Sequence, residues 1–253
     1  MPPIVQSFAF TGAVQNFVVP VGVSSIQVEC WGAQATGVTI NQVTGGLGGY
    51  AKGNLAVTVG ETLTIYVGGG NGYNGGGDAP TINNANNKGG GATDLRQDGV
   101  ALGNRRIVAG GGGSTAETLA AGGLYGGAGG GGYYGGGGGS NNFAPGQAGS
   151  LGQGGNAGNS SDSNQSVPSQ PGGTGGGLTG GDGGGTVSGK GGTQVAGGVG
   201  GAVAGTATGG SGGGGSSYLG GVTNGVTTAG SKTGHGAMTL TYEVRLDGPR
   251  MMA

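Results

Sequence analysis

The chain is poor in charged residues. Only 8% of its 253 residues are charged and the formal net charge is −1, whereas about 25% of the residues of an ordinary soluble domain are charged. A nucleic-acid-binding protein needs a basic surface that displaces counterions from phosphates. A chain that is disordered because of its charge needs a high net charge. The composition excludes both classes.

Cysteine and long apolar runs are also scarce. Cys30 is the only cysteine, so no disulfide can form within the chain. No run of about 18 apolar residues is present, the length that a membrane-spanning helix requires, and we expect no membrane insertion. The residues after Met1 lack the basic and then apolar pattern of a secretory signal peptide. We expect such a peptide to be absent or to have been removed.

Residues that could carry chemistry are few and scattered. His235 is the only histidine, and we place it in a turn before a strand. Glycine-rich phosphate loops need Gly-Lys-Ser/Thr at the start of a helix, and 189–191 and 231–233 do not fit. Since no acid, base and nucleophile or metal ligands converge in the sequence, we expect no enzyme activity and no cofactor.

Alternating apolar residues are the clearest structural signal. β-Branched residues at every second position predict strands with one buried face. The last such stretch lies far beyond the others, and the simplest topology returns it to the N-terminal strands. Helix signals are nearly absent, the best candidate being 114–121. The alternating stretches are 17–23, 26–30, 55–59, 63–67 and 238–244.

Glycine dominates the middle of the chain. Of the 76 glycines, 22 lie in residues 1–109 and 53 in residues 110–236. A collagen helix is excluded because the chain has only 8 prolines and runs such as 135–139 break the Gly-X-Y triplet. Two alternatives stay open for this region, a flexible linker and a packed bundle of polyglycine helices in the polyproline II conformation.

The packed bundle is the interpretation we favour. Polyproline II helices have no internal hydrogen bonds, so their backbone groups must bond to neighbouring helices or to water. Glycine permits the required close approach. Runs such as 110–113 suit a central helix, and Gly-Gly-X repeats such as 191–193 suit a surface helix. Tyrosines within the region also favour order, since flexible linkers lack aromatic residues.

Several motifs in order resemble the glycine-rich domain family of bacterial and phage proteins. The same succession is similar to the extracellular glycine-rich region of the anaplastic lymphoma kinase and leukocyte tyrosine kinase receptors. The similarity covers about residues 6–244. The motifs are SIQVECWGAQ at 25–34, GGYAKG at 48–53, ETLTIYVGG at 61–69, GGGATDLR at 89–96, RIVAGGGG at 106–113 and GGGSSY at 213–218.

The resemblance implies an all-β fold, in which a TNF-like or jelly-roll β-sandwich carries a large inserted bundle of polyglycine II helices. The sandwich would comprise 1–109 and 237–253, and the bundle 110–236. The chain differs from the receptors because it cannot form their disulfides, and the receptors' cytokine-binding residues have no counterpart here. By architecture and composition it also resembles phage tail-fibre tip adhesins.

Two groups of residues stand out in the sequence. Four are expected to be structural: Cys30 as a small buried residue, Trp31 as a core or junction ring, and Asp94 with Arg96 as an ion pair near Arg105 and Arg106. The others are candidates for surface binding, because tyrosine gives rigid contact area and polar loops surround it. These are Tyr125, Tyr133, Tyr134, Asn141, Asn142, Asn156, Asn159, Asp162, Asn164 and Tyr218.

The expected function is that of a non-enzymatic extracellular structural or adhesive protein. Either a virion tail-fibre or spike component or a surface filament subunit fits. The alternative is a recognition module whose bundle-tip loops bind a protein or a glycan, such as one on a host surface. The expected partners are further copies of the chain, as a trimer or fibre, and other virion or cell-surface components. An edge strand at 238–244 would be suited to pairing between copies.

Overall fold

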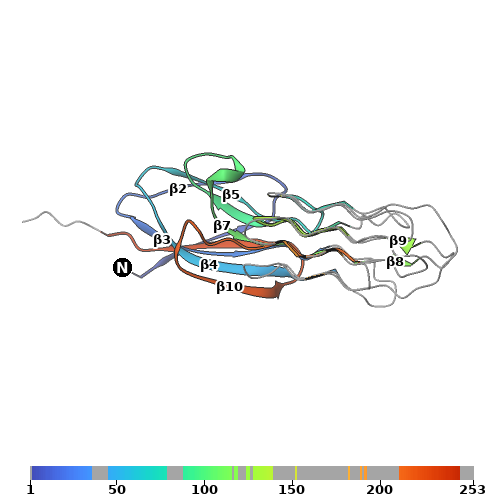
Figure 1. The fold of residues 1–253 in the computed structure, drawn as a ribbon. Coiled ribbons are helices and arrows are strands. Elements are labelled where there is room, and N and C mark those ends of the chain that lie inside the picture. The colour runs from blue at the N-terminus through green and yellow to red at the C-terminus, as the bar shows by residue number, and fades with distance from the viewer. Residues whose placement is uncertain are drawn as a thin grey trace, which may run out of the picture.

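The computed structural model describes residues 2–35, 45–78, 88–115, 117–118, 124–125, 128–138, 152, 182, 189, 191–192 and 211–245. These residues are almost entirely β-strand or extended chain (Figure 1). The strands are β1 (Ile4–Ala9), β2 (Gln15–Val18), β3 (Ser25–Trp31), β4 (Gly48–Ala56), β5 (Thr62–Tyr66), β6 (Thr93–Arg96), β7 (Arg105–Ala109), β8 (Glu117–Thr118), β9 (Leu124–Tyr125), β10 (Thr223–Lys232) and β11 (Ala237–Tyr242), with a short 3-10 helix at Leu102–Asn104.

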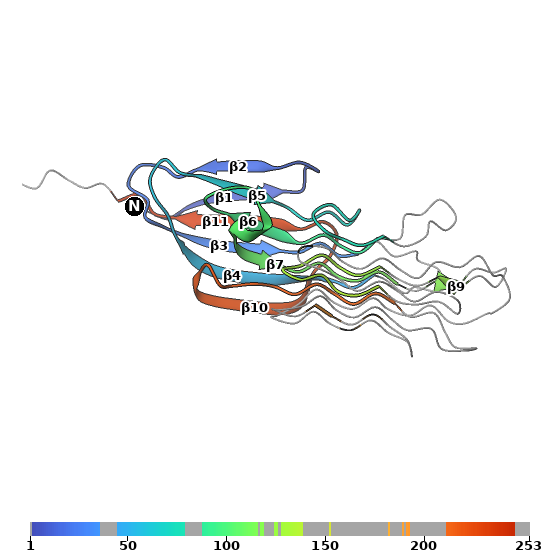
Figure 2. The same ribbon diagram turned by 45° about the horizontal axis from the view of Figure 1, so that its top comes forward.

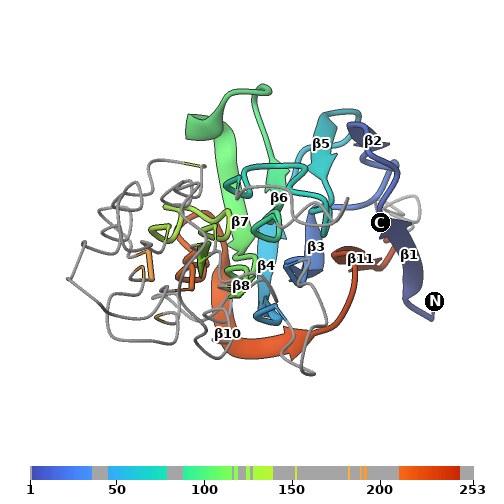
Figure 3. The ribbon, with the colours of Figure 1, turned by 90° about the vertical axis from the view of Figure 1, so that its right-hand side faces the viewer.

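Two antiparallel sheets lie face to face, and we call them together the two-sheet part. The first has the strand order β1-β11-β3-β4-β10, and the second has the order β2-β5-β6-β7. The end-on view in Figure 3 shows these two layers. The short pair β8-β9 stands apart from both. The all-β prediction is therefore confirmed.

The alternating stretches form the core between the sheets. In β3, Ile26, Val28 and Cys30 face inward and are fully buried, while the residues between them face outward. Leu63 and Ile65 of β5 meet them from the other sheet in the same apolar cluster. Each large aliphatic side chain buried in this way contributes about 1.5–3 kcal/mol.

The last strand lies where the topology predicted. β11 pairs with β3 along its whole length, from Ala237 opposite Trp31 to Tyr242 opposite Ile26. Its other side pairs with β1, so β11 is an inner strand and not an edge. The prediction of a free edge at 238–244 is wrong, because the N-terminal strand occupies that side.

Three other predictions are wrong in detail. Pro20 and Gly22 were expected to interrupt a strand at 17–23, and β2 does end at Val18, but the alternation also predicted Val21 to face inward, and it is 80% exposed because Gly22, at a φ of 80°, turns the chain there. Thr223–Lys232 falls within the range predicted for the glycine bundle but forms β10 of the five-stranded sheet. Within the helix candidate 114–121, Glu117–Thr118 is a strand paired with Leu124–Tyr125. Residues 116 and 119–121 of that candidate lie outside the described part of the chain.

Candidate functional site

Extended glycine-rich segments leave one end of the two-sheet part and run alongside one another (Figure 2). We call the described residues 32–35, 45–49, 89–91, 110–115, 128–138, 189–192 and 211–217 the glycine segments; of 189–192, residue 190 is not described. Apart from Gly48 and Gly49, which begin β4, and a single bridge residue at Tyr134, they are not strands of either large sheet. They nevertheless bond to each other through their backbones.

Hydrogen bonds from segment 110–115 repeat at every third residue. The N–H groups of Gly111 and Ser114 donate to segment 128–132, and the carbonyls of the same two residues accept from segment 211–217. The four bonds are Gly111 N–H to Gly131 O (2.7 Å), Ser114 N–H to Ala128 O (2.8 Å), Gly215 N–H to Gly111 O (2.9 Å) and Gly212 N–H to Ser114 O (3.0 Å).

The other residues of this segment bond to different neighbours. The carbonyls of Gly110 and Gly113, again three residues apart, accept from the N–H groups of Gly49 and Gly46 at 2.8 and 2.9 Å. Gly112 accepts from Gly90 and donates to Ala33. One segment is thus bonded to five others, whereas a strand in a sheet has two neighbours at most. The bonding directions turn around the chain axis with a period of three residues.

Segment 211–217 shows the same period with different partners. Its residues 213 and 216 donate to segment 134–137 and accept from segment 130–133, while residues 211 and 214 accept from 189–192. The bonds are Gly213 N–H to Gly137 O (2.9 Å), Ser216 N–H to Tyr134 O (3.0 Å), Gly130 N–H to Gly213 O (2.9 Å), Tyr133 N–H to Ser216 O (2.8 Å), Gly189 N–H to Ser211 O (2.9 Å) and Gly192 N–H to Gly214 O (3.0 Å).

Buried serines stand where these segments depart from glycine. The Ser114 hydroxyl accepts the N–H of Ala128 at 2.7 Å, and the Ser217 hydroxyl accepts the N–H of Gly110 at 3.1 Å. The Ser216 hydroxyl accepts the N–H of Tyr134 at 3.1 Å. A small hydroxyl fits between close backbones and supplies an acceptor for a buried donor. This role was not predicted, although Ser-Ser between glycine runs was a signal for it.

Arg105 of β7 fastens the glycine segments to the second sheet. Its guanidinium donates to the carbonyls of Leu102, Gly132 and Tyr133 at 2.9, 2.9 and 3.0 Å. Burial lowers the pKa of this guanidinium, and an arginine in a protein cannot lose its proton. The buried charge is therefore stabilised by carbonyl oxygens that belong to the segment it holds.

Three of the candidate tyrosines gather beside Arg105. The rings of Tyr133 and Tyr218 are stacked with centroids 3.9 Å apart, and Tyr134 meets Tyr133 edge-on at 5.5 Å. The Arg105 guanidinium lies 4.7 Å from the Tyr133 ring centre. Tyr218 also bonds through its backbone to Val108 of β7 at 2.9 Å in both directions. All three rings are partly buried, so they pack at the junction and keep one exposed side.

The expected ion pair between Asp94 and Arg96 is formed and buried. The Arg96 Nε donates to Asp94 Oδ1 at 2.7 Å, and Asn74 Nδ2 donates to Asp94 Oδ2 at 2.8 Å. Arg96 also lies 3.7 Å over the ring of Tyr66. Asn74 lies in the loop after β5, and Gly77 of the same loop donates to Gly129 of a glycine segment at 2.8 Å, so this cluster ties β6 to a loop that is bonded to the glycine segments.

Cys30 and Trp31 lie at the end of β3. Cys30 is fully buried, and burial raises the pKa of its thiol. Trp31 is half-buried on the outer face of the sheet, with its ring 5.1 Å from that of Tyr50. Its carbonyl accepts from the Thr93 hydroxyl at 2.6 Å. Trp31 is thus a junction ring and not a core ring.

His235 lies in the turn before β11, as expected. Its Nδ1 accepts the N–H of Gly70 at 3.1 Å, and its ring stacks on Phe10 with centroids 4.2 Å apart. Both contacts hold the imidazole as part of the turn. Among the described residues no group of three or more His, Cys, Asp or Glu side chains is placed to hold a metal ion, and no helix is long and apolar enough to cross a membrane.

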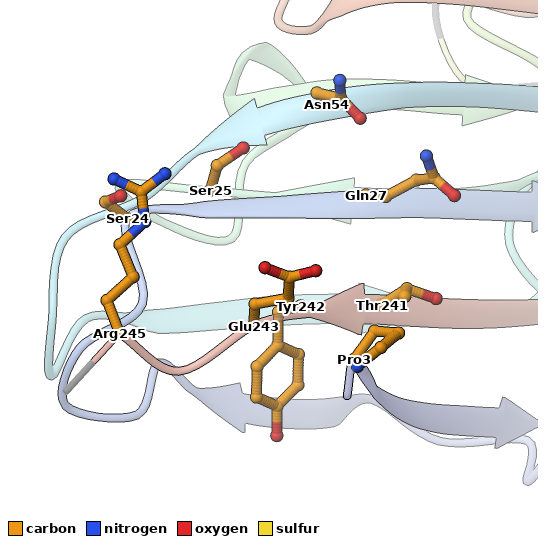
Figure 4. A pocket seen from close by; sticks show the side chains of 9 residues that line it. All are labelled: Pro3, Ser24, Ser25, Gln27, Asn54, Thr241, Tyr242, Glu243 and Arg245. Atoms are coloured by element: carbon orange, nitrogen blue, oxygen red, sulfur yellow. The ribbon is translucent and has the colours of Figure 1, made fainter. Parts of the chain in front are cut away.

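A groove of about 430 Å³ opens at the end of the two-sheet part away from the glycine segments (Figure 4). Thr241, Gln27 and Asn54 form one cross-strand row on its floor, since each is paired with the next in the strand register. Glu243 follows along the groove, and Arg245 lies beside Ser24 at its far end. Within the described chain these two charged side chains form no ion pair. The groove thus offers amide, hydroxyl, carboxylate and guanidinium groups to a small polar ligand.

Most of the remaining binding candidates lie outside the described residues: Asn141, Asn142, Asn156, Asn159, Asp162 and Asn164. Of Tyr125 only the backbone, in β9, is described. The groove was not predicted, because its residues come from three separate strands. Compared with known proteins, the chain matches no protein-family model and has no significant sequence match among curated proteins. The resemblance to the glycine-rich family stays a prediction.

Gly215→Ala is predicted to destabilise the protein. A Cβ at residue 215 would overlap the backbone carbonyl of Gly131, which cannot move without breaking its bond to Gly111. We expect a loss of about 1–3 kcal/mol, as for other overpacked sites, measured by thermal unfolding. Gly103→Ala is the matched control because open space surrounds that position. Equal melting temperatures for the two variants would contradict close packing of the segments.

Asp94→Asn is predicted to destabilise the two-sheet part strongly. The variant keeps the shape of the side chain but leaves the buried Arg96 charge without its carboxylate, at a cost of about 3–5 kcal/mol. Asp98→Asn removes the exposed partner of Arg106 and is expected to cost at most about 1 kcal/mol. Urea unfolding of both variants measures the difference. Losses of equal size would show that burial does not decide the strength of these pairs.

Proposed function

We propose that this chain is a non-enzymatic structural or adhesive protein of an extracellular surface. The observation that carries the proposal is the three-residue period of hydrogen bonding among the glycine segments. A polyproline II helix has three residues per turn and no internal hydrogen bonds, so this period supports a bundle of polyglycine II helices. The bundle would be inserted in a TNF-like or jelly-roll sandwich.

Such a bundle suits a mechanical role. Each glycine segment is held by backbone hydrogen bonds to several neighbouring segments, so none can bend or unfold without breaking hydrogen bonds to the others. Backbone groups that are engaged in this way are also poorly accessible to proteases, which require a locally opened chain. A stiff, protease-resistant rod fits a virion tail-fibre or spike component or a surface filament subunit.

The state of the two most reactive side chains also supports a non-enzymatic role. Cys30 is fully buried with the pKa of its thiol raised, and a neutral thiol is a poor nucleophile. The His235 Nδ1 is engaged by the N–H of Gly70. Neither group is therefore presented to a substrate as a nucleophile and base pair.

Surface labelling tests the location. Antibodies raised against the purified chain are expected to bind the surface of the virus or cell whose genome encodes it, in intact virions or in cells that have not been permeabilised. Electron microscopy with gold-conjugated antibodies measures this binding. Labelling that occurs only after cells are permeabilised, with none on virions, would contradict the proposal. Preimmune serum on the same samples is the control.

Recognition of a glycan is the second candidate function. The groove favours it, because its amides and hydroxyls can donate to and accept from the hydroxyl groups of a sugar. The bundle-tip loops, at residues 141–142 and 156–164, are the other candidate location. A glycan array probed with the wild-type chain, with Gln27→Ala/Asn54→Ala and with a deletion of 156–164 separates the two locations. A variant that binds glycans as the wild-type chain does excludes the location that it alters.

A further inference from the structure

The two sheets together have four edges, and they differ in how well they are protected. An edge strand offers unpaired backbone groups to another chain unless it is short, bulged, charged or covered. β7 is covered, because Val108 bonds to Tyr218 and the N–H of Gly221 donates to Arg106. β2 has only four residues and is followed by Pro20. These two edges are poorly suited to pairing.

β10 is protected in another way. Its pairing with β4 shifts register twice, and Asn224 and Gly230 have φ angles of 52° and 58°. These irregularities bend the strand away from the flat geometry that a partner strand needs. The strand also ends at a charged residue, Lys232.

β1 has none of these protections. Its six residues pair with β11 without a register shift, from Ile4 opposite Tyr242 to Ala9 opposite Ala237. Within the described chain, the only backbone group of β1 that accepts a hydrogen bond from outside β11 is the Ala9 carbonyl, which the Gln15 side chain reaches at 2.9 Å. β1 carries no charged side chain. Its edge is regular, and none of the residues that the structure describes pairs with it.

Exposed apolar side chains gather near the same edge. Of the nine exposed large hydrophobic side chains among the described residues, five belong to the first 21 residues. β1 and β2 lie at the same edge of the two-sheet part, as the end-on view shows (Figure 3). Beneath them the rings of Phe8 and Phe17 meet edge-on, with their centroids 6.5 Å apart. The five are Ile4, Val5, Val14, Val18 and Val21.

The two strands at this edge also carry no charge of their own. No Asp, Glu, Lys, Arg or His occurs between residues 2 and 28, a stretch that contains both β1 and β2. An uncharged apolar surface is suited to an apolar partner and offers nothing to a charged ligand. An antiparallel strand pair about a twofold axis is complementary to itself, so a second copy of this chain satisfies the requirement.

We propose that β1 pairs antiparallel with β1 of a second copy, forming one continuous ten-stranded sheet across a twofold axis. Ile4, which shares the inward face of β1 with Phe8, and the exposed valines around β2 of each copy then face the partner, while Val5 of each copy lies on the outer face of the joined sheet near the axis. This inference is independent of the proposed function, since it uses none of the glycine segments. The pairing closes the edge of the five-stranded sheet that the described residues leave regular and unpaired.

Sedimentation velocity tests the pairing. The molar mass derived from sedimentation of the wild-type chain is expected to be twice that of one 23.4 kDa chain. Val5→Lys places a charge in β1, which has none, next to the same charge of the second copy, and is expected to raise the dimer dissociation constant at least about tenfold. Val226→Lys is the matched control, because Val226 is 53% exposed, similar to Val5 at 60%, but lies on β10 at the opposite edge. It should leave the dimer intact.

Three outcomes would overturn the proposal: a wild-type chain that is monomeric up to about 1 mM, the weak end of specific association; dissociation of the dimer by Val226→Lys alone; or a dimer that Val5→Lys leaves intact. Thermal melting of both variants verifies that the chains are folded, which their exposed positions allow. Hydrogen exchange adds a readout specific to strand pairing. The amides of residues 4–8 should exchange faster in the Val5→Lys monomer than in the wild-type dimer.

Discussion

The structure depends on one interaction, the hydrogen bond between backbones that no side chain keeps apart. A packed glycine loses more conformational entropy than other residues, at about 1–2 kcal/mol of backbone ordering per residue. One hydrogen bond contributes only about 1 kcal/mol net. The glycine segments therefore need bonds in several directions at once, and the three-residue period of 110–115 and 211–217 provides them.

The two-sheet part supplies what glycine cannot, an apolar core that fixes where the segments begin. Segment 32–35 follows β3, segment 45–49 leads into β4 and segment 110–115 follows β7, so the two sheets place these three segments side by side, and they bond to one another. The buried charge of Arg105 lies at this transition and bonds to the carbonyl of Leu102 in the two-sheet part and to that of Gly132 in a glycine segment. The hydrophobic core therefore orders the glycine segments through the strands that join them and through this arginine.

The sequence predicted those features that side-chain patterns encode. Ile26, Val28 and Cys30 alternate and are buried, and the ion pair of Asp94 with Arg96 followed from their shared strand face. The edge strand β10 was missed because both of its faces are largely exposed, which removes the alternation. The cluster of Arg105 with Tyr133 and Tyr218 joins residues far apart in sequence, and no pattern along the chain reports it. Ser-Ser between glycine runs marks a departure from glycine, but it does not show which backbone groups the hydroxyls bond to.

Amide hydrogen exchange of the glycine segments tests the account most directly. If the segments are held by backbone bonds on all sides, the amides of 111–114 and 212–216 exchange many times more slowly than in an unstructured peptide. They should also become exposed together with those of β3 and β11, in a single unfolding transition. Exchange of these glycine amides at the rate of a random coil, with the strands still protected, would contradict the central claim.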